Sequence, residues 1–444
     1  MVIHKITRII LTFGLALAGI TLLSQPFQSV PINNIGTRLD KTVSKLSSPI
    51  RRASLLKQIS HLESLGEMQA LSSPAEVSFR EIGQHILVET YIEGMSKPLS
   101  LILDSGVKSL ILQRSLAGEI SLEDTVDFTP WETYGLVEQA SIGAASFNQI
   151  GAYVVNFSTP GHPLYCLSEH GVIGASLMKH GVWQIDYEAQ TITIAENLNQ
   201  LIQTKSQRQD HRGQALFKVP MSFQENRPFI QLEVGHGRTI EVMVDTGWGG
   251  HLQLNRQDLS LQQQSMPPVA TIQGVVETLK GLSAFEQRVV SLAELTLGDL
   301  VLHDYEIFVN DSPPESSEAA IGNDFLRHFV VTFDWPGHML YLEPIDRPQD
   351  MSPRLEGYGF QSMAQGQSLW VTGLYHPSPA ADAGLQVGDQ IVSINGDSYH
   401  PIPADQPCDY LLRPVGSRYS GPITVTVIRQ ETPMTFRMAP DILL

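Results

Sequence analysis

The sequence predicts a mainly β protein made of two similar, consecutive β units followed by a smaller third domain. From about residue 79, short alternating apolar runs are separated by Gly- and Pro-containing turns, which is typical of strands. One residue pattern occurs twice in this region, and a different composition begins after residue 353. A chain of 444 residues is long enough for about three domains.

The composition indicates a globular protein with an acidic body. Hydrophobic residues make up 42% of the chain and charged residues 17%, which is unlike disordered or fibrous proteins. The net charge is -17, although the first 57 residues carry eight Lys or Arg against the single acid Asp40. Because phosphate backbones are bound by basic surfaces, we expect no nucleic acid partner.

The first 31 residues resemble a targeting segment. Lys5 and Arg8 precede the apolar run from Ile9 to Leu23, which is the order found in signal peptides. This run is short for a membrane span of about 20 residues, yet no clear small-x-small cleavage site follows it. Residues 1–31 are therefore either a cleaved signal peptide or an N-terminal membrane anchor. Either one predicts an exported, periplasmic or otherwise extracytoplasmic protein.

Residues 32–78 are basic and contain a helical pattern of apolar residues, namely Leu55, Leu56, Ile59, Leu62 and Leu65. We expect a helix between the targeting segment and the body. It is either a stalk helix or a pro-segment whose basic residues lie across an acidic cleft.

The two β units are indicated by an internal repeat. Residues 171–194 align without a gap to residues 319–342, and the identical pairs are Ile173/Ile321, Gly174/Gly322, His180/His328, Val182/Val330 and Asp186/Asp334. Upstream of each segment lies a similar element, LILDSG or VMVDTG. Duplication of one β unit explains this order. We place the units at residues 79–196 and 215–346, with residues 197–214 as a linker.

Each unit offers one carboxylate, Asp104 or Asp245, on a turn that leaves a hydrophobic strand. If the units pack about a pseudo-twofold axis, the two carboxylates meet and share one proton, because like charges about 3 Å apart cannot both ionise. One carboxylate then acts as a base toward a water molecule, while the other protonates a peptide carbonyl.

The residues next to each carboxylate fit a supporting role. Gly106 and Gly247 permit a tight turn. The hydroxyl groups of Ser105 and Thr246 are placed to cross-brace the two loops.

From about residue 80 to residue 345, the chain resembles bacterial retropepsin-like and pepsin-like aspartic proteases. In that family, an apolar-apolar-Asp-Thr/Ser-Gly turn is followed by an apolar-apolar-Gly strand, here ending at Gly174 and at Gly322. The resemblance implies two retropepsin-like acid-protease lobes that form one bilobal pepsin-like unit. It also implies aspartic endopeptidase activity on a peptide or protein substrate, with Gly174 and Gly322 threading behind the catalytic turns.

Three features depart from the family pattern or match it weakly. Val107 and Trp248 occupy positions where the family has Ser, Thr or Ala. The hydrogen bond that a Ser or Thr hydroxyl group makes to the catalytic carboxylate is therefore missing. We expect this loss to raise the pKa of the pair or to weaken catalysis. Tyr134, followed by Gly135, resembles the flap tyrosine of pepsin-like enzymes.

Two alternatives to a single-chain peptidase remain open. One is a non-catalytic peptide-binding scaffold of the cell envelope, and the other is a protein whose lobes pair between two chains.

Other chemistries lack their residues. The chain has no Gly-x-Ser-Gly-Gly turn, no HExxH pattern and no Gly-rich phosphate loop. His180 and His328 have no nearby nucleophile or acid in sequence and are expected to be structural. Cys166 and Cys408 suggest no zinc site, and we expect two unpaired thiols, with one long-range disulfide as the alternative. We predict no metal and no organic cofactor.

Residues 354–444 resemble a PDZ domain. The resemblance rests on GYGF at residues 357–360 and SPAADAGLQVGDQIVSING at residues 378–396. It implies that the backbone of Tyr358, Gly359 and Phe360 receives the terminal carboxylate of a peptide, which adds as a strand to the domain. We interpret the domain as a module that captures substrate or a partner's C-terminal peptide; the alternative is a packing module without a ligand.

Overall fold

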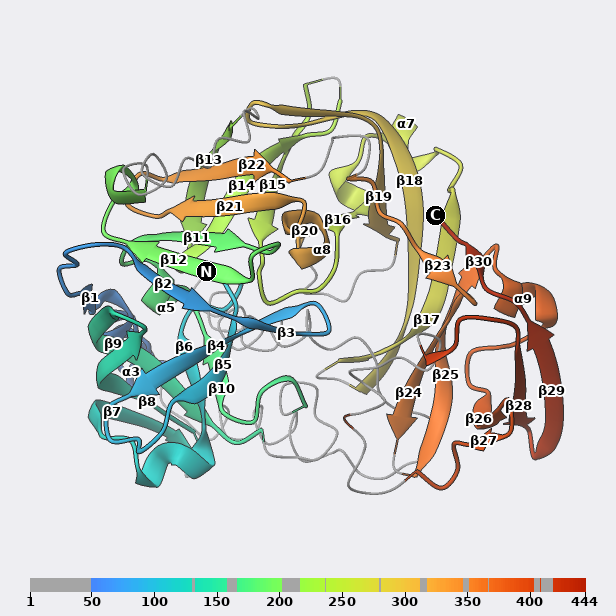
Figure 1. Ribbon diagram of the computed structural model, residues 1–444, viewed down its shortest axis with the longest axis horizontal. Coiled ribbons are helices and arrows are strands. Elements are labelled where there is room, and N and C mark those ends of the chain that lie inside the picture. The colour runs from blue at the N-terminus through green and yellow to red at the C-terminus, as the bar shows by residue number, and fades with distance from the viewer. Residues whose placement is uncertain are drawn as a thin grey trace.

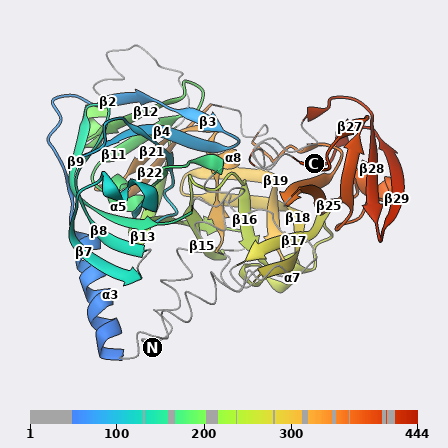
Figure 2. The ribbon, with the colours of Figure 1, turned by 90° about the horizontal axis from the view of Figure 1, so that it is seen from below.

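The computed structural model describes residues 49–129, 132–157, 166–201, 216–235, 237–278, 281–311, 318–345, 351–365, 367–402, 408 and 418–444. The predicted targeting segment lies outside these residues. The fold is mainly β, and Figures 1 and 2 show the third domain at one end of the molecule, beside the second β unit. Within the described part of the chain, no helix is long and apolar enough to cross a membrane.

The first β unit, called repeat 1 (79–196), consists in its described residues of strands, one 3-10 helix and one short α-helix. Its elements are β3 (Arg80–Ile82), β4 (His85–Ile92), β5 (Leu99–Leu103), β6 (Leu110–Gln113), the 3-10 helix η1 (Arg114–Gly118), β7 (Leu122–Thr129), β8 (Glu132–Ile142), β9 (Ala145–Val155), β10 (Gly171–Ile173), α5 (Ala175–Met178), β11 (Val182–Asp186) and β12 (Thr191–Ala195).

The second β unit, called repeat 2 (215–346), has the same order of elements, with one additional short helix after its 3-10 helix. They are β13 (Phe217–Gln224), β14 (Arg227–Glu233), β15 (Thr239–Val244), β16 (Leu252–Asn255), the 3-10 helix η2 (Arg256–Asp258), α7 (Leu261–Gln264), β17 (Ala270–Thr278), β18 (Gly281–Leu297), β19 (Leu300–Asn310), β20 (Ala320–Ile321), α8 (Asn323–Leu326), β21 (Phe329–Asp334) and β22 (Met339–Pro344).

Strand pairing is the same in both repeats. Strand β10 lies parallel to β5 and antiparallel to β6, and β20 lies parallel to β15 and antiparallel to β16. The parallel pairs β6–β9 and β16–β19 also correspond. The sequence repeat is therefore a repeat of topology.

A shared sheet joins the repeats in the order β2–β12–β11–β21–β22–β13, where β2 is Ala75–Ser78. At its centre, β11 and β21 are antiparallel, with Val182 opposite Asp334 and Asp186 opposite Val330. Val182 is the repeat equivalent of Val330, and Asp334 is that of Asp186, so the second pair is the symmetry equivalent of the first. This relation is the signature of a local twofold axis. Buried apolar side chains of both repeats form one continuous core.

Residues 49–78 are part of this folded body. Helix α3 (Pro49–Ser64) packs Ile59 and Leu62 against Tyr134 and Leu136 of β8. Strand β1 (Glu67–Met68) pairs with β9, and β2 pairs with β12, so the first repeat gains strands from before residue 79. The expected helix is present and is docked on repeat 1; residues 49–78 are not a free linker.

The third domain (354–444) has its own apolar core. Its elements are β23 (Glu356–Gly357), β24 (Phe360–Gln365), β25 (Ser368–His376), α9 (Pro379–Ala383), β26 (Gln390–Ile394), β27 (Asp397–Ser398), β28 (Ile423–Arg429), β29 (Thr432–Met438) and β30 (Asp441–Ile442). The main sheet runs β24–β25–β26–β28–β29.

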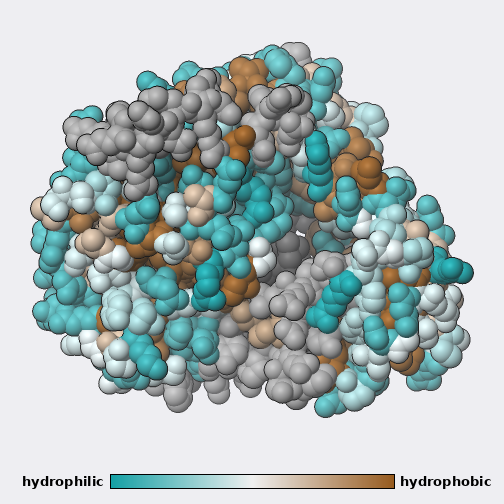
Figure 3. Space-filling view, viewed as in Figure 1, coloured by the Kyte–Doolittle hydropathy of each residue, from teal (hydrophilic) through white to brown (hydrophobic). Residues whose placement is uncertain are grey.

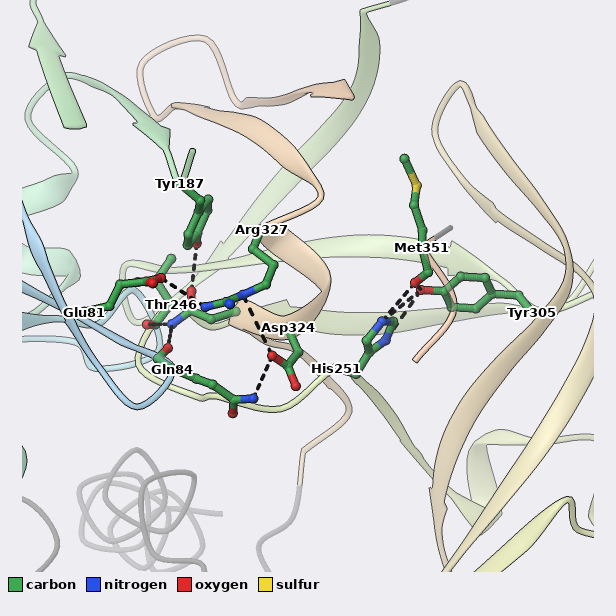
Figure 4. Close-up of polar contacts among 10 residues, drawn as sticks. Glu81, Gln84, Tyr187, Thr246, His251, Tyr305, Asp324, Arg327 and Met351 are labelled. Carbon is green, nitrogen blue, oxygen red and sulfur yellow. Dashed lines mark hydrogen bonds and ion pairs between the residues drawn. The ribbon is translucent and has the colours of Figure 1, made fainter. Parts of the chain in front are cut away.

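Two non-covalent contacts fix the third domain to repeat 2. The C-terminal half of β25 pairs with β17, with Thr271 opposite His376 and Gly274 opposite Gly373. In addition, Met351 is fully buried in the core of the repeats, and its carbonyl accepts hydrogen bonds from Tyr305 and from the His251 ring (Figure 4).

A disulfide bond links Cys166 of repeat 1 to Cys408 of the third domain, with the two Cα atoms 5.1 Å apart. The prediction of two unpaired thiols is therefore wrong. The cysteines are 242 residues apart in sequence, and only the return of the third domain toward repeat 1 brings them together, so their spacing gave no signal.

Candidate active site

Asp104 and Asp245 each begin a loop at the end of a central strand, β5 or β15. The backbone amide of Asp104 donates to Ile173 O, and that of Asp245 donates to Ile321 O, both at 2.9 Å. Strands β10 and β20 therefore hold the start of each loop in the same way. Both carboxylates come from one chain, on opposite sides of the local twofold axis.

The two loops brace each other through a reciprocal set of hydrogen bonds. The amide of Ser105 donates to Thr246 Oγ1 and the amide of Thr246 donates to Ser105 Oγ, each at 3.0 Å. In turn, Ser105 Oγ donates to Val244 O at 2.7 Å, and Thr246 Oγ1 donates to Leu103 O at 3.1 Å. All four groups are buried, so neither hydroxyl group can be removed without leaving a buried amide unpaired.

Each carboxylate lies against the glycine of the opposite loop. A Cβ atom placed on Gly106 would be 2.5 Å from Asp245 Cγ, and one on Gly247 would be 2.0 Å from Asp104 Cγ. Only glycine fits at either position. The two carboxylates therefore face each other across the twofold axis.

Gly174 and Gly322 lie behind the loops. A Cβ on Gly174 would be 2.2 Å from Ser109 O, and a Cβ on Gly322 would be 2.4 Å from Gly250 O. Directly after these glycines, the amide of Ala175 donates to Val107 O and that of Asn323 donates to Trp248 O. These residues therefore lie closely behind the two turns.

The environment of the pair favours one shared proton. Burial, followed by repulsion from Asp245, raises the pKa of Asp104 well above its usual range. Burial also raises the pKa of Asp245, to about 6, against the opposing effects of hydrogen bonding and of the Arg227 cation. Asp104 Oδ2 is buried and receives no donor from the described residues, so it is an oxygen that can hold the proton.

The carboxylates differ in their backbone donors. Asp104 Oδ1 accepts from the amides of Gly106 and Val107, whereas Asp245 Oδ1 accepts from the amide of Gly247. The Val107 side chain is buried in an apolar cluster of repeat 1, so its amide, and not a hydroxyl group, supplies the second bond.

Trp248 is accommodated by glycines. Cβ atoms on Gly250 and Gly322 would lie 2.0 Å and 2.7 Å from its indole ring. The ring therefore packs on the backbone of these two residues.

Tyr134, the predicted flap residue, is only 1% exposed and lies beneath α3. Its hydroxyl group is 3.1 Å from Ser109 Oγ. This placement makes Tyr134 a core residue of repeat 1, and its assignment as a flap is wrong. The Tyr-Gly pair in the sequence carried no information on which face of its strand would be covered by α3.

Sequence reasoning missed a polar cluster beside the second loop (Figure 4). Asn323 Nδ2 donates to Thr246 O at 2.6 Å and to Gln84 O at 2.8 Å, and its Oδ1 accepts from the Tyr187 hydroxyl group. Arg327 pairs with Glu81 at 3.0 Å. These contacts attach the β3–β4 turn of repeat 1 to α8 of repeat 2. A polar residue directly after the apolar-Gly strand was the available signal.

His180 and His328 lie away from the carboxylates. Burial lowers the pKa of His180 to about 4, and His328 lies near the buried His251 ring. Among the described residues, no group of three or more His, Cys, Asp or Glu could hold a metal ion.

Hydrophilic residues dominate the face of the molecule seen in Figure 3.

In the third domain, the predicted carboxylate-binding loop precedes β24. The Tyr358 side chain is buried, and its hydroxyl group donates to Gly421 O at 2.5 Å. Gly359 has φ +80°, and a Cβ on it would be 2.1 Å from Ser378 Cβ, so glycine is required there. Among the described strands, β24, which starts at Phe360, pairs with β25 alone, leaving its other edge for a further strand.

Comparison with known proteins identifies part of the third domain. Residues 370–406 match the family model for the PDZ domain, while no curated protein matches the chain. The matched residues begin within β25 and follow the Tyr358–Phe360 loop. The chain therefore contains a PDZ domain at residues 370–406.

Proposed function

We propose that the chain is an aspartic endopeptidase made of two retropepsin-like lobes, repeat 1 and repeat 2, which form a bilobal pepsin-like unit. The observation that carries this proposal is the pair of buried carboxylates, Asp104 and Asp245, which face each other across a local twofold axis. Their loops are held by reciprocal hydrogen bonds, which provides the fixed geometry that acid–base catalysis requires.

In this proposal, a water molecule bound between the carboxylates attacks the peptide carbonyl carbon. Asp245 accepts a proton from the water, and Asp104 donates its proton to the carbonyl oxygen, giving a tetrahedral diol. When the diol collapses and the C–N bond breaks, Asp245 donates its proton to the leaving amine and Asp104 takes a proton from a diol hydroxyl group, which restores the starting protonation of the pair. No covalent enzyme intermediate forms, and the reaction needs only one proton shared by the pair.

The test compares the purified protein with its Asp245→Asn and Asp104→Asn variants on an unfolded-protein substrate from pH 3 to 8, with and without pepstatin. The matched control is Asp334→Asn, which alters a buried carboxylate that caps the turn before β22. We expect cleavage by the wild type and the control and a loss of at least 10³-fold in either dyad variant. Cleavage that persists in both dyad variants would refute the proposal.

A second candidate is a non-catalytic peptide-binding scaffold. It is supported by the PDZ domain, a kind of domain that typically binds peptides, together with the missing hydroxyl residues at Val107 and Trp248. In either candidate, the ligand of the third domain is a C-terminal peptide. It adds as a strand beside β24, and its carboxylate binds to the backbone of Tyr358, Gly359 and Phe360. Binding of a fluorescent peptide library, measured for wild type and Gly359→Val, tests this site.

We propose that the protein is exported, with residues 1–31 as signal peptide or anchor. The Cys166–Cys408 disulfide supports this, because disulfides persist in oxidising compartments. Cell fractionation with thiol labelling tests it, since a reduced protein in the cytoplasm would contradict export.

A further inference from the structure

The two carboxylate loops are related by symmetry, but the residues that face them are not. Strand β4 pairs with β5 so that Leu87 lies opposite Ile102, and β14 pairs with β15 so that Phe229 lies opposite Met243. Asp104 and Asp245 follow directly after β5 and β15. If the same register is extended two residues beyond these pairs, His85 is opposite Asp104 and Arg227 is opposite Asp245. Since side chains alternate along a strand, each of these residues is on the face of its carboxylate.

Arg227 is held firmly at this position. It is 4% exposed, its Nη1 atom lies 2.8 Å from Glu318 Oε2 and 3.4 Å from Met243 Sδ, and its guanidinium carbon lies 5.5 Å from the centre of the Phe229 ring. Glu318 directly precedes Ala319, whose carbonyl oxygen accepts a hydrogen bond from the amide of Met243. The cation is therefore fixed beside β15, the strand that directly precedes Asp245.

We propose that Arg227 is a positioning residue that keeps the Asp245 carboxylate ionised, so that Asp245 is the base and Asp104 keeps the proton. This inference rests on the proposed peptidase function. Arginine stays charged at all working pH values, whereas burial lowers the pKa of His85 to about 4, so the matching position in repeat 1 is neutral.

The charged groups around Asp245 act in known directions. Asp104 faces it from the other loop, Arg227 faces it from β14, and Glu318 lies before β20. The Arg227 cation lowers the pKa of Asp245 and the Glu318 carboxylate raises it, and burial raises it more than either charge changes it. The Glu318 side chain is 36% exposed, whereas that of Arg227 is 5% exposed, so solvent screens the anion more strongly than the cation.

One effect acts in the opposite direction. Asp104 receives two backbone donors and Asp245 receives one, and this difference favours ionised Asp104. These donors carry partial charges, whereas Arg227 carries a full charge in a buried site, where charge interactions are strongest. Even so, the Gly247 amide lowers the pKa of Asp245 more than the Arg227 cation does. Arg227 adds to that effect on the Asp245 side, whereas the matching residue beside Asp104 is His85, whose pKa is lowered to about 4.

The test measures the pKa that governs the acidic limb of kcat/KM for wild type, Arg227→Met and Glu318→Gln. Loss of the cation is expected to raise this pKa by about 1 unit, and loss of the anion to lower it by a smaller amount. Arg227→Lys keeps the charge and should stay near the wild-type value. The matched control is Arg288→Met, which removes a partly buried cation of repeat 2 that pairs with Asp311, and it should leave the pKa of the acidic limb unchanged.

If Arg227 had a purely structural role, Arg227→Met and Glu318→Gln would both change the stability of the protein, but they would not shift the pKa of the acidic limb in opposite directions. Equal or unidirectional shifts in Arg227→Met and Glu318→Gln would overturn the assignment. If the wild type cleaves nothing, ¹³C NMR titration of the aspartate carboxyl groups in the same four variants still measures the pKa values of the pair. The inference about Arg227 and the proposed activity can therefore fail separately.

Discussion

At the scale of single residues, the site depends on hydroxyl groups and glycines whose contacts link the two loops. The hydroxyl groups of Ser105 and Thr246 each satisfy one amide of the opposite loop and donate to one carbonyl group. The glycines beside them leave room for the opposite carboxylates. Because these contacts are reciprocal, one substitution disturbs both halves of the site.

Replacing Thr246 with valine tests this bracing. The substitution keeps the shape but removes the acceptor of the Ser105 amide and the donor to Leu103 O. We expect a loss of about 2–3 kcal/mol in the free energy of unfolding, measured by urea denaturation, because a buried amide is left unpaired. Thr246→Ser keeps the hydroxyl group and should lose less than half as much; equal losses would contradict the bracing role.

The buried pair also predicts a pH dependence of stability. The pKa of both carboxyl groups is raised in the folded protein, so the folded state binds protons that the unfolded state releases above about pH 4. The contribution of the pair to stability is therefore complete below about pH 4 and falls as pH rises. Relative to the double variant Asp104→Asn/Asp245→Asn, the wild type should lose about 1.4 kcal/mol per pH unit for each proton released.

The comparison with the double variant is needed because buried histidines act in the opposite direction. The pKa values of His85 and His180 are lowered to about 4 and that of His251 to about 3, so their contributions grow as pH rises toward 6.5. These contributions are present in both proteins and cancel in the difference. A difference that rises between pH 4 and pH 6 in urea titrations would contradict raised pKa values in the pair.

At the scale of elements, repeated local patterns were predictable and contacts between distant segments were not. The Asp-Ser-Gly and Asp-Thr-Gly turns, and the strands ending at Gly174 and Gly322, depend on nearby residues whose types carry their role. The burial of Tyr134 under α3 and the pairing of β17 with β25 depend on packing between segments far apart in sequence. The position of Arg227 opposite Asp245 needed the register of two strands, which the sequence alone does not specify.

Helix α3 provides a test of whether residues 49–78 belong to the body. Leu62 is 5% exposed and packs on Tyr134, and Glu63 pairs with the buried Lys108 at 2.7 Å. We expect Leu62→Ala to cost about 2–4 kcal/mol in the unfolding free energy of the whole protein. Lys57→Ala, at an exposed position of the same helix, is the control. If α3 were a detachable pro-segment, both variants would unfold like the wild type.

At the scale of the whole molecule, three connections join the PDZ-containing third domain to the repeats. Strand β17 of repeat 2 pairs with β25 of the third domain. Met351 anchors the connecting segment in the core of the repeats, and the disulfide bond links the third domain to repeat 1. The first two contacts are made with repeat 2 and its core, whereas the third reaches the other repeat. The third domain therefore connects both sides of the proposed dyad.

The disulfide should stabilise the whole chain by restricting its unfolded state. A bond between residues 242 positions apart contributes at most about 5.5 kcal/mol in the chain-entropy treatment. We expect Cys166→Ser and Cys408→Ser to lower the unfolding free energy by the same amount, and the double variant to lose no more than either single one, because all three lack the same cross-link. Dithiothreitol should destabilise the wild type to the level of the variants and leave them unchanged. Single variants that lose different amounts, or losses that add in the double variant, would show that the cysteines act separately and that no cross-link holds the third domain to repeat 1.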